Sequence, residues 1–293
     1  MDQQEWLARQ FEEQRPHLRA VAYRMLGSLA EADDAVQDSW LRLSRTDTSE
    51  VENLRAWLTT IVARVALNML RSRRTRREQS LEVHVPDPIV DPADGTDPEH
   101  EALLADSVGL ALLVVLETLT PAERLAFVLH DMFAVPFDEI GDIVGRSPEA
   151  TRQLASRARR RVRGAAPEPD ADLDAQREVV EAFLAAAREG DFEGLVSLLH
   201  PDVVLRADYG PPRGFDEVRG RDAALERARS YAKLGLTAQL VLVNGAPGVV
   251  TLDADGKPFS LGSIVVREGR IAEIDFLADP ERLARLDVSW LRG

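Results

Sequence analysis

The stretch that decides the fold of the first half of the chain is FDEIGDIVGRSPEATRQLASRARRRVR, residues 137–163. It predicts two short helices joined at Gly145, the second with Ser147 as its N-cap and Pro148 at its first helical position. Every fourth residue of this second helix is apolar, which predicts a narrow stripe that packs on a partner: Ala150, Leu154, Ala158 and Val162. The outer face is basic, as is typical of the recognition helix of a helix-turn-helix; beside Gln153 and Ser156 it carries Arg152, Arg157, Arg159, Arg160, Arg161 and Arg163.

Length and charge distribution indicate several units with local basic surfaces. A chain of 293 residues, 45% of them hydrophobic, predicts two or three compact units. The net charge of -14 would repel DNA if it were spread evenly. However, residues 64–77 carry six arginines and no acid, and residues 146–163 carry seven arginines against one glutamate. Because salt screens charges over about 8 Å, such local patches decide whether DNA binds.

Several classes of protein are excluded by what the sequence lacks. There is no cysteine, so disulfides and thiolate metal sites are excluded. The five histidines are scattered without metal-ligand spacing, and we expect neither a metal nor a cofactor. The longest apolar run, residues 108–116, is far shorter than the roughly 18 residues that span a membrane. The polar, acidic N-terminus is unlike a signal peptide, so we expect a cytoplasmic protein that does not bind membranes.

Residues 1–77 predict a helical unit. Apolar residues at helical spacing lead to Gly27, and Ser28 to Glu31 form a capping box for a helix that ends near Leu43. One face of that helix is acidic, and it is either solvated or binds a basic partner: Asp34, Gln37, Asp38 and Leu41. A polar loop, 45–52, leads to a further helix capped by Asn53. Its predicted core stripe is Leu54, Trp57, Leu58, Ile61, Val65 and Met69.

Residues 78–106 have the composition of a linker. They hold nine acids, four prolines and no lysine or arginine, and such a segment cannot bury enough apolar surface to fold alone. Helices resume near Leu103, and Thr120 to Glu123 form a second capping box. The helix that starts there precedes the helix-turn-helix and completes a second small helical unit, 107–164.

The order of these parts resembles the extracytoplasmic-function (ECF) sigma factors of RNA polymerase. The resemblance rests on EADDAVQDSW at 31–40, RAWL at 55–58, the arginine run, the acidic linker and the helix-turn-helix. It covers residues 1–163, as regions 2 and 4. The further C-terminal part is similar to the SigJ-like group, which carries a fused SnoaL-like domain. The implied fold is two all-α domains followed by an α+β cone. The expected divisions are region 2 at 1–77, the acidic linker at 78–106, region 4 at 107–164, a tether at 165–171 and the SnoaL-like domain at 172–293.

The resemblance also implies roles for residues. Asp34, Gln37, Asp38 and Leu41 match the positions that dock on the coiled coil of the polymerase β′ subunit, and the β flap is a further expected contact. The helix after Asn53 matches the segment that meets the −10 element, with these candidate contacts: Arg64, Asn68, Arg71, Arg73 and Arg74. In region 4 the residues expected at base edges of the −35 element are Arg152, Gln153, Ser156 and Arg157, and those expected at phosphates are Arg160, Arg161 and Arg163. The acidic linker would thread the polymerase channel, where it mimics RNA phosphates.

The C-terminal sequence changes class after a short Pro and Ala tether. Its patterns predict helices near 179–187, 192–199 and 221–234, with hairpin turns at 255–256 and 268–269. Alternation predicts strands at 203–208, 236–243, 249–253, 261–267 and 271–277. The order is similar to the SnoaL-like cone fold, which encloses a pocket between a curved sheet and its helices.

Two uses of this pocket remain open from the sequence. Enzymes of this fold use carboxylates and histidines as acids and bases, and the available groups are His200, Asp202, Asp208, Tyr209 and Asp275. His200 to Asp202 also fit a helix-to-strand corner, where turn residues are expected. We therefore predict no catalytic residue and a regulatory domain, which docks on regions 2 or 4 or holds an unknown small ligand. A plain ligand-responsive regulator is the third possibility, but it leaves the region 2 helices unexplained.

Overall fold

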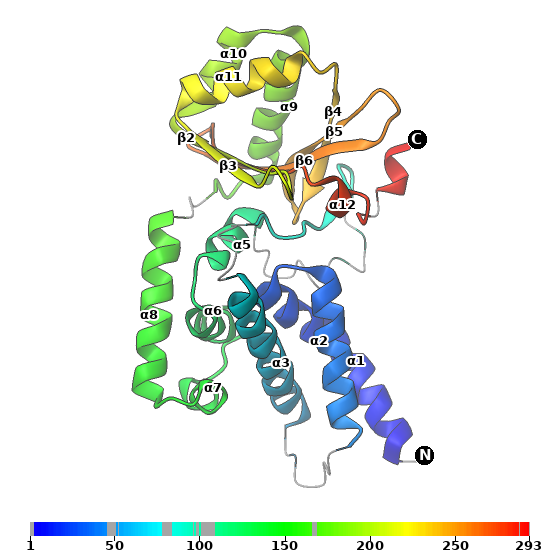
Figure 1. The fold of residues 1–293 in the computed structure, drawn as a ribbon, viewed down its shortest axis with the longest axis vertical. Coiled ribbons are helices and arrows are strands. Elements are labelled where there is room, and N and C mark those ends of the chain that lie inside the picture. Colours follow the sequence, from blue (N-terminus) through cyan, green and yellow to red (C-terminus); the bar gives the residue numbers. More distant parts are fainter. Residues whose placement is uncertain are drawn as a thin grey trace. The chain divides into compact units, whose positions relative to one another are not determined.

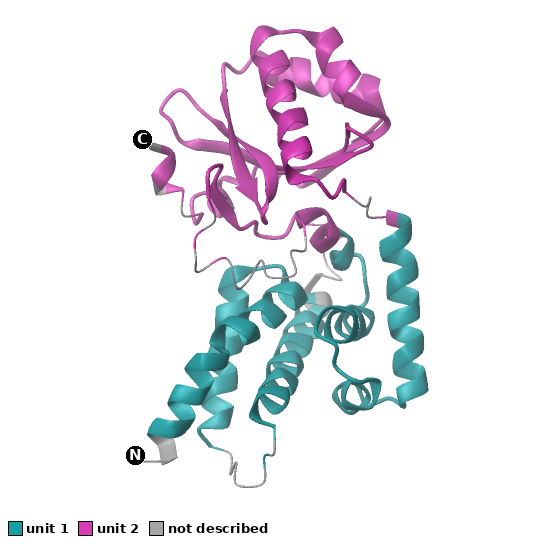
Figure 2. Cartoon of the chain, turned by 180° about the vertical axis from the view of Figure 1, so that it is seen from behind, with its two compact units in different colours: residues 1–81, 101–106, 115–164 teal, residues 82–100, 107–114, 165–293 magenta. Residues whose placement is uncertain are grey.

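The computed structural model describes residues 3–45, 51, 53–77, 84–95, 97, 100, 109–165, 169–286 and 288–292. The chain forms two compact units (Figure 2). The first is helical and comprises residues 1–81, 101–106 and 115–164, so it unites the two helical domains expected from the sequence. The second comprises 82–100, 107–114 and 165–293, so it contains part of the acidic linker together with the C-terminal domain.

The helices begin where the sequence predicts caps. The Ser28 side chain accepts the N–H of Glu31, Asn53 accepts that of Ala56, and Thr120 and Glu123 form a reciprocal capping box. The resulting elements are α1 (Gln3–Leu26), α2 (Leu29–Leu43), α3 (Leu54–Arg77), α5 (Leu110–Glu117), α6 (Pro121–Phe127), the π-helix η1 (Val128–Met132), α7 (Phe137–Val144) and α8 (Pro148–Ala165).

The buried side of α3 is broader than the predicted stripe. Leu58 and Val65 are buried as expected, whereas Trp57 and Met69 are only half-buried. Fully buried positions that the stripe missed include Val62, Ala63 and Ala66. The reason is that α3 packs against α1 and α2 and also against α6 and α7, so more than one side of the helix is covered.

The predicted helix-turn-helix is present as α7 and α8. Gly145 adopts a left-handed φ of 70°, and its N–H bonds to the carbonyl of Gly141. The buried face of α8 is Thr151, Leu154, Ala155 and Ala158. The predicted stripe was therefore right at Leu154 and Ala158 but wrong at Ala150 and Val162, which are half-buried. An i, i+3, i+4, i+7 face covers more surface than a single i+4 row, and α8 uses this wider face.

The C-terminal unit is an α+β fold, as predicted. Its elements are α9 (Leu173–Glu189), α10 (Phe192–Leu198), β2 (Leu199–Asp208), β3 (Phe215–Arg219), α11 (Arg221–Ala232), β4 (Thr237–Val243), β5 (Ala246–Leu252), β6 (Pro258–Arg267), β7 (Arg270–Leu277), α12 (Pro280–Leu283) and the 3-10 turn η2 (Ser289–Arg292). The sheet order is β1-β4-β5-β6-β7-β2-β3, in which β4 to β7 form an antiparallel meander and β2 runs parallel to β7. Helices α9, α10 and α11 cover one face (Figure 1).

Two edge strands were not predicted. Strand β1 (Val90–Pro92) comes from the predicted linker and pairs antiparallel with β4, with Val90 opposite Val243. Strand β3 lies at the other edge, beside β2. In addition, β2 begins at Leu199, so His200 to Asp202 belong to the strand. They lie in its irregular first part, where the register with β7 shifts, and not in a turn between helix and strand as predicted. The core between sheet and helices includes Val180, Leu184, Leu205 and Ile274.

Candidate nucleic-acid and polymerase interfaces

The acidic face predicted on α2 lies on the surface. Asp34, Gln37, Asp38 and Leu41 are all exposed, and their i, i+3, i+4, i+7 spacing places them on one side of the helix. The opposite side is buried in the helical unit through Ala32, Ala35, Val36, Ser39 and Leu43. Leu41 is 44% exposed, so the acidic face also presents one apolar side chain.

The predicted −10 residues divide into two groups. Arg64, Asn68 and Arg71 are exposed at i, i+4, i+7 on α3 and form one ridge. Arg73 instead turns toward the start of α2, where it bonds to the Leu26 carbonyl at 3.1 Å and ion-pairs with Glu31. Because these partners occupy its guanidinium, Arg73 is a weaker candidate for DNA than the other three. The side chain of Arg74 lies outside the described residues, as does most of the 45–52 loop.

The predicted −35 residues are all exposed on α8. One face of α8 carries a row of residues at i, i+4, i+8 and i+11, with Gln153 at its side: Arg152, Ser156, Arg160 and Arg163. We call these four residues the Arg152 row. The guanidinium of Arg152 lies over the ring of Phe137, 5.3 Å from its centroid. This contact orients the arginine at the N-terminal end of the helix, the end that usually contacts bases.

Arg157 and Arg161 lie on another side of α8 and share one carboxylate. Glu123 of α6 binds Arg157 Nε at 3.0 Å and Arg161 at 3.1 Å. Burial acts to raise the pKa of Glu123, but hydrogen bonds from Thr120 and Arg157 outweigh it, so the pKa is lowered and the group stays charged. Both arginine side chains remain 50% exposed. They can therefore meet DNA only in competition with Glu123.

Sequence reasoning missed a buried arginine that joins regions 2 and 4. Arg124 of α6 is 2% exposed; its Nε and Nη2 donate to the carbonyl of Arg24 in α1 at 3.2 Å, and its Nη1 pairs with Glu117 at 2.6 Å. Nearby, the Arg24 guanidinium lies 5.0 Å from the centroid of the Phe133 ring. The only sequence signal is a Glu-Arg pair inside an otherwise apolar helix, and that signal does not identify the partners.

A second arginine holds the linker segment within the C-terminal unit. Arg282 of α12 donates from Nη2 to the Val85 carbonyl at 2.6 Å, from Nε to Asp87 at 2.9 Å and from Nη1 to Asp208 at 2.9 Å. Asp208 also accepts the backbone N–H of Val85 at 3.0 Å. We call Arg282, Asp208, Val85 and Asp87 the linker clamp. Next to it, Asn244 and Ile89 exchange two hydrogen bonds.

The possible catalytic groups of the C-terminal unit do not meet in one cavity. The space between sheet and helices holds about 160 Å³ and is lined by 21 residues, among which there is no acid and no histidine. Leu205 and Ile274 face it, so the alternating Arg206 and Asp275 lie on the other face of the sheet.

Each of these groups has a local partner or faces solvent. Arg206 pairs with Asp275 at 3.0 Å, and burial raises the pKa of Asp275 to about 6 against the opposing charge of Arg206. His200 bonds to Arg267, Tyr209 to Tyr231, and Asp202 is exposed. Among the described residues, moreover, no cluster of three metal-ligating side chains is found.

Comparisons with known proteins decide the family. The chain matches the families described as Sigma-70 region 2 over residues 10–76, Sigma-70, region 4 over 109–162, and SnoaL-like domain over 180–276. It is 41% identical over 288 residues to the ECF RNA polymerase sigma factor SigJ of Mycobacterium tuberculosis, covering 93% of this chain and 92% of that one. The chain belongs to the ECF sigma factors.

Further similarities extend over the whole sigma factor. A probable ECF RNA polymerase sigma factor SigI, also of Mycobacterium tuberculosis, is 32% identical over 275 residues and covers 92% of each chain. The crystal structure of Mycobacterium tuberculosis SigJ superposes with a TM-score of 0.77 at 38% identity, covering 94% of this chain and 98% of that one. The resemblance and fold class inferred from the sequence are thereby confirmed.

As a sigma factor, the protein binds RNA polymerase core and directs promoter-specific transcription initiation. Its α2 and α3 fall within the region 2 match and its α7 and α8 within the region 4 match. None of the helices in the described ranges offers an apolar stretch long enough to cross a bilayer. The roles of single residues at DNA and polymerase are not fixed by these similarities, and they stay predictions.

Proposed function

We propose that this sigma factor uses three separate helix faces for its three contacts. The acidic face of α2 docks on the β′ coiled coil, the ridge of Arg64, Asn68 and Arg71 contacts the −10 element, and the Arg152 row of α8 reads the −35 element, with the β flap as a further contact. The support is that each face is exposed and chemically suited to its partner. An acidic face fits a basic coiled coil, and guanidinium groups fit guanine edges and phosphates.

The Arg152 row supports a sharper assignment within α8. Because Arg157 and Arg161 are engaged with Glu123, Arg160 and Arg163 are the better candidates for phosphate contacts, and Arg152 for a base edge. Arg152→Ala should lower transcription from a promoter with the native −35 element by about tenfold, the value of one bidentate base contact. Binding to core polymerase should be unaffected. Unchanged reporter activity would refute the base-reading role.

We further propose that the C-terminal domain regulates initiation by holding the linker. The observation that carries this proposal is the linker clamp together with β1, which adds residues 90–92 to the domain's own sheet. The resemblance to the ECF sigma factors implies that the acidic linker enters the polymerase channel. Residues 84–92 cannot lie in that channel and pair with β4 at the same time. The C-terminal domain and the polymerase therefore compete for one segment.

The test is run-off transcription with purified core polymerase and full-length variants. Arg282→Ala removes the donor to the Val85 carbonyl and to Asp87 and so weakens the hold on the linker, and activity per active complex should rise at least severalfold. Arg285→Ala is the matched control, because Arg285 is exposed three residues away and no side-chain hydrogen bond or ion pair joins it to the linker residues that the structure describes. Equal activity of the two variants would overturn the regulatory role, and it would leave the sigma activity itself intact.

The geometry gives no support to the enzyme alternative. General acid–base catalysis needs a titratable group within hydrogen-bond reach of the substrate. The cavity between sheet and helices offers Tyr231, Thr251 and Ser260 but no carboxylate or imidazole. Of the three candidate carboxylates, Asp208 and Asp275 are engaged with Arg282 and Arg206, and Asp202 is exposed outside the cavity. A non-catalytic transcription factor is the function these observations favour, and because it works with RNA polymerase we propose that it acts in the cytoplasm.

A further inference from the structure

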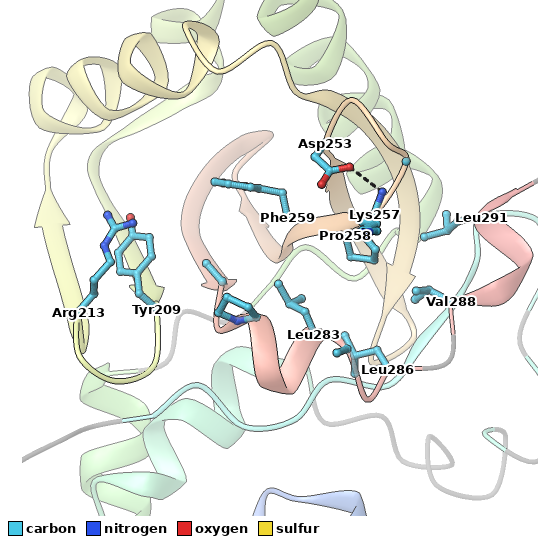
Figure 3. A pocket seen from close by; sticks show the side chains of 14 residues that line it. Tyr209, Arg213, Asp253, Lys257, Pro258, Phe259, Leu283, Leu286, Val288 and Leu291 are labelled. Atoms are coloured by element: carbon cyan, nitrogen blue, oxygen red, sulfur yellow. Dashed lines mark hydrogen bonds between the residues drawn. The ribbon is translucent and has the colours of Figure 1, made fainter.

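A larger cleft lies elsewhere in the C-terminal unit, at the end of the sheet where α12 crosses. It holds about 800 Å³, within the range of small-molecule sites. Figure 3 shows Tyr209 and Arg213 on one side, Val288 and Leu291 on the other, and Phe259 and Leu283 between them. The cleft shares no lining residue with the cavity between sheet and helices.

The lining combines an apolar floor with two cations. Arg213 lies 4.1 Å from the centroid of the Tyr209 ring, which keeps its guanidinium at the rim. Within the part of the chain that the structure describes, neither Arg213 nor Lys257 has a carboxylate partner. Asp253 is the one acid among the 14 lining residues, and its Oδ1 accepts the backbone N–H groups of Asp255 and Lys257, each at 2.9 Å. A net positive lining in a chain of net charge -14 favours an anion.

We propose that this cleft binds a small amphipathic anion, with one carboxylate or a similar acidic head and an apolar body. The head would bind Arg213 and Lys257 through charge-assisted hydrogen bonds. The body would cover Phe259 and Leu286, which are half-buried, and the edge of the buried Leu283, all of which line the cleft. A neutral ligand would leave both cations unused, and a cation would be repelled by them.

The position of the cleft connects its ligand to the linker clamp. Pro280 and Leu283 of α12 line the cleft, and Arg282 between them holds Val85 and Asp87. A ligand that packs on α12 stabilises the arrangement in which Arg282 reaches the linker. Because coupling between sites is reciprocal, a held linker also favours the ligand. This second step rests on the proposed regulatory role, whereas the ligand site does not.

The binding test compares three probes with the same eight-carbon tail on the full chain by isothermal titration calorimetry: octanoate, 1-octanol and octylammonium. Octanoate should bind at least tenfold more tightly than octanol, since a charged hydrogen bond is worth about 1.5–3 kcal/mol, and octylammonium should bind least. The double variant Arg213→Met with Lys257→Met should reduce octanoate to the affinity of octanol. Both residues are exposed, so these changes leave the fold intact.

Two further variants make the binding test decisive. Arg219→Met is the matched control, because Arg219 pairs with Glu217 on the surface outside the cleft, and it should not change binding. Ala284→Trp fills the cleft and should abolish binding of octanoate. The site would be overturned if octanol bound as tightly as octanoate. It would also be overturned if octanoate bound the double variant or Ala284→Trp with unchanged affinity.

Hydrogen exchange of residues 84–92 tests the coupling separately. Octanoate should slow exchange there at least threefold, and only when Arg282 is present. Unchanged exchange with intact octanoate binding would reject the coupling but not the ligand site. The run-off assay with Arg282→Ala uses no ligand, so a failure of the proposed regulation is seen independently of both.

Discussion

Two arginines join distant segments of this sigma factor, and they differ mainly in burial. Arg124 links α6 to the carbonyl of Arg24 and to Glu117 while 2% exposed. Arg282 links α12 to Val85 and to two carboxylates, with 19% of its side chain exposed. Both use a backbone carbonyl on a segment far away in the sequence together with a carboxylate, which is distant for Arg282 but only seven residues away for Arg124. The same chemistry is thus placed once inside the helical unit and once where the arginine and one of its carboxylates, Asp87, are partly exposed.

The difference in burial predicts that the Arg124 and Arg282 contacts have different roles. Breaking a buried ion pair leaves an uncompensated charge in the interior, so such a contact stays closed in the folded state. In the Arg282–Asp87 pair 19% and 27% of the two side chains are exposed, so water can replace either partner at lower cost, although Asp208 is itself buried. Arg124 is therefore expected to hold regions 2 and 4 together structurally, whereas Arg282 can release the linker when a partner competes for it.

The largest effect is expected at Arg124. Arg124→Met should lower the free energy of unfolding of the helical unit by about 3–5 kcal/mol, because Glu117 loses its buried partner. Urea unfolding followed by tryptophan fluorescence measures this, since Trp6, Trp40 and Trp57 all lie in the helical unit.

The control for this variant is Arg15→Met. Arg15 pairs with Glu12 on the surface of α1, with 46% and 60% of the two side chains exposed, and its loss should cost less than about 0.5 kcal/mol. If both variants lost the same stability, burial would not distinguish the Arg124 contact and the comparison with Arg282 would fail.

A drop in pH should affect the helical unit and the linker clamp differently. His17 touches Phe133 edge-on beside Arg24, and burial, with the charges of Arg55 and Arg24, lowers its pKa from 6.5 to about 4. The folded helical unit therefore takes up this proton less readily than the unfolded chain. Its stability should fall as the pH drops from 6.5 to 4, by at most about 3 kcal/mol. His17→Gln cannot take up a proton and should flatten this slope in the same fluorescence assay.

The linker clamp should stay closed over the same pH range, from 6.5 to 4. Burial acts to raise the pKa of Asp208, but hydrogen bonds from His84 and Gly210 and the charge of Arg282 outweigh it, and the pKa is lowered. A lowered carboxyl pKa contributes stability that is present above the unfolded value, 3.8, and is lost only below it. Hydrogen exchange of residues 84–92, corrected for its intrinsic pH dependence, should stay constant between pH 6.5 and 4. Loss of protection at pH 5 would contradict this.

Releasing the clamp should loosen the linker without unfolding the domain. Arg282→Ala should speed hydrogen exchange at Val85 about tenfold or more, since one charged hydrogen bond is worth about 1.5–3 kcal/mol. Exchange in β6 and β7 should change far less, because their ladder does not involve Arg282. Equal acceleration in linker and sheet would mean that Arg282 supports the whole fold, as Arg124 does in the helical unit.

The features that the sequence predicted well are governed by neighbouring residues. The caps at Ser28, Asn53 and Thr120 and the left-handed turn at Gly145 need only a few adjacent side chains, and all are present. The same holds for the hairpin turns at 255–256 and 268–269, since local turn chemistry determines them.

The features that the sequence did not predict depend on distant partners. Strand β1 has three residues and no alternation, and it becomes a strand only because β4 offers an open edge. Arg73, Arg124 and Arg157 are all arginines in basic or helical surroundings, yet each is bound by a partner that only the tertiary structure supplies. Composition identified the basic surfaces but could not show which of their side chains were already engaged.

The smallest expected effect concerns the arginines that Glu123 engages on α8. Glu123→Gln keeps the capping box, which accepts glutamine at the same position, but removes the charge that binds Arg157 and Arg161. If these arginines then reach phosphates, binding to a −35 duplex should steepen in salt dependence by one to two units, about 0.9 for each contact. Fluorescence anisotropy at several salt concentrations measures this slope.

Asp142→Asn, on the exposed surface of α7, removes one acid without releasing an arginine and should leave the slope unchanged. An unchanged slope in Glu123→Gln would show that the two arginines do not reach the duplex even when free, and that the Arg152 row alone contacts it.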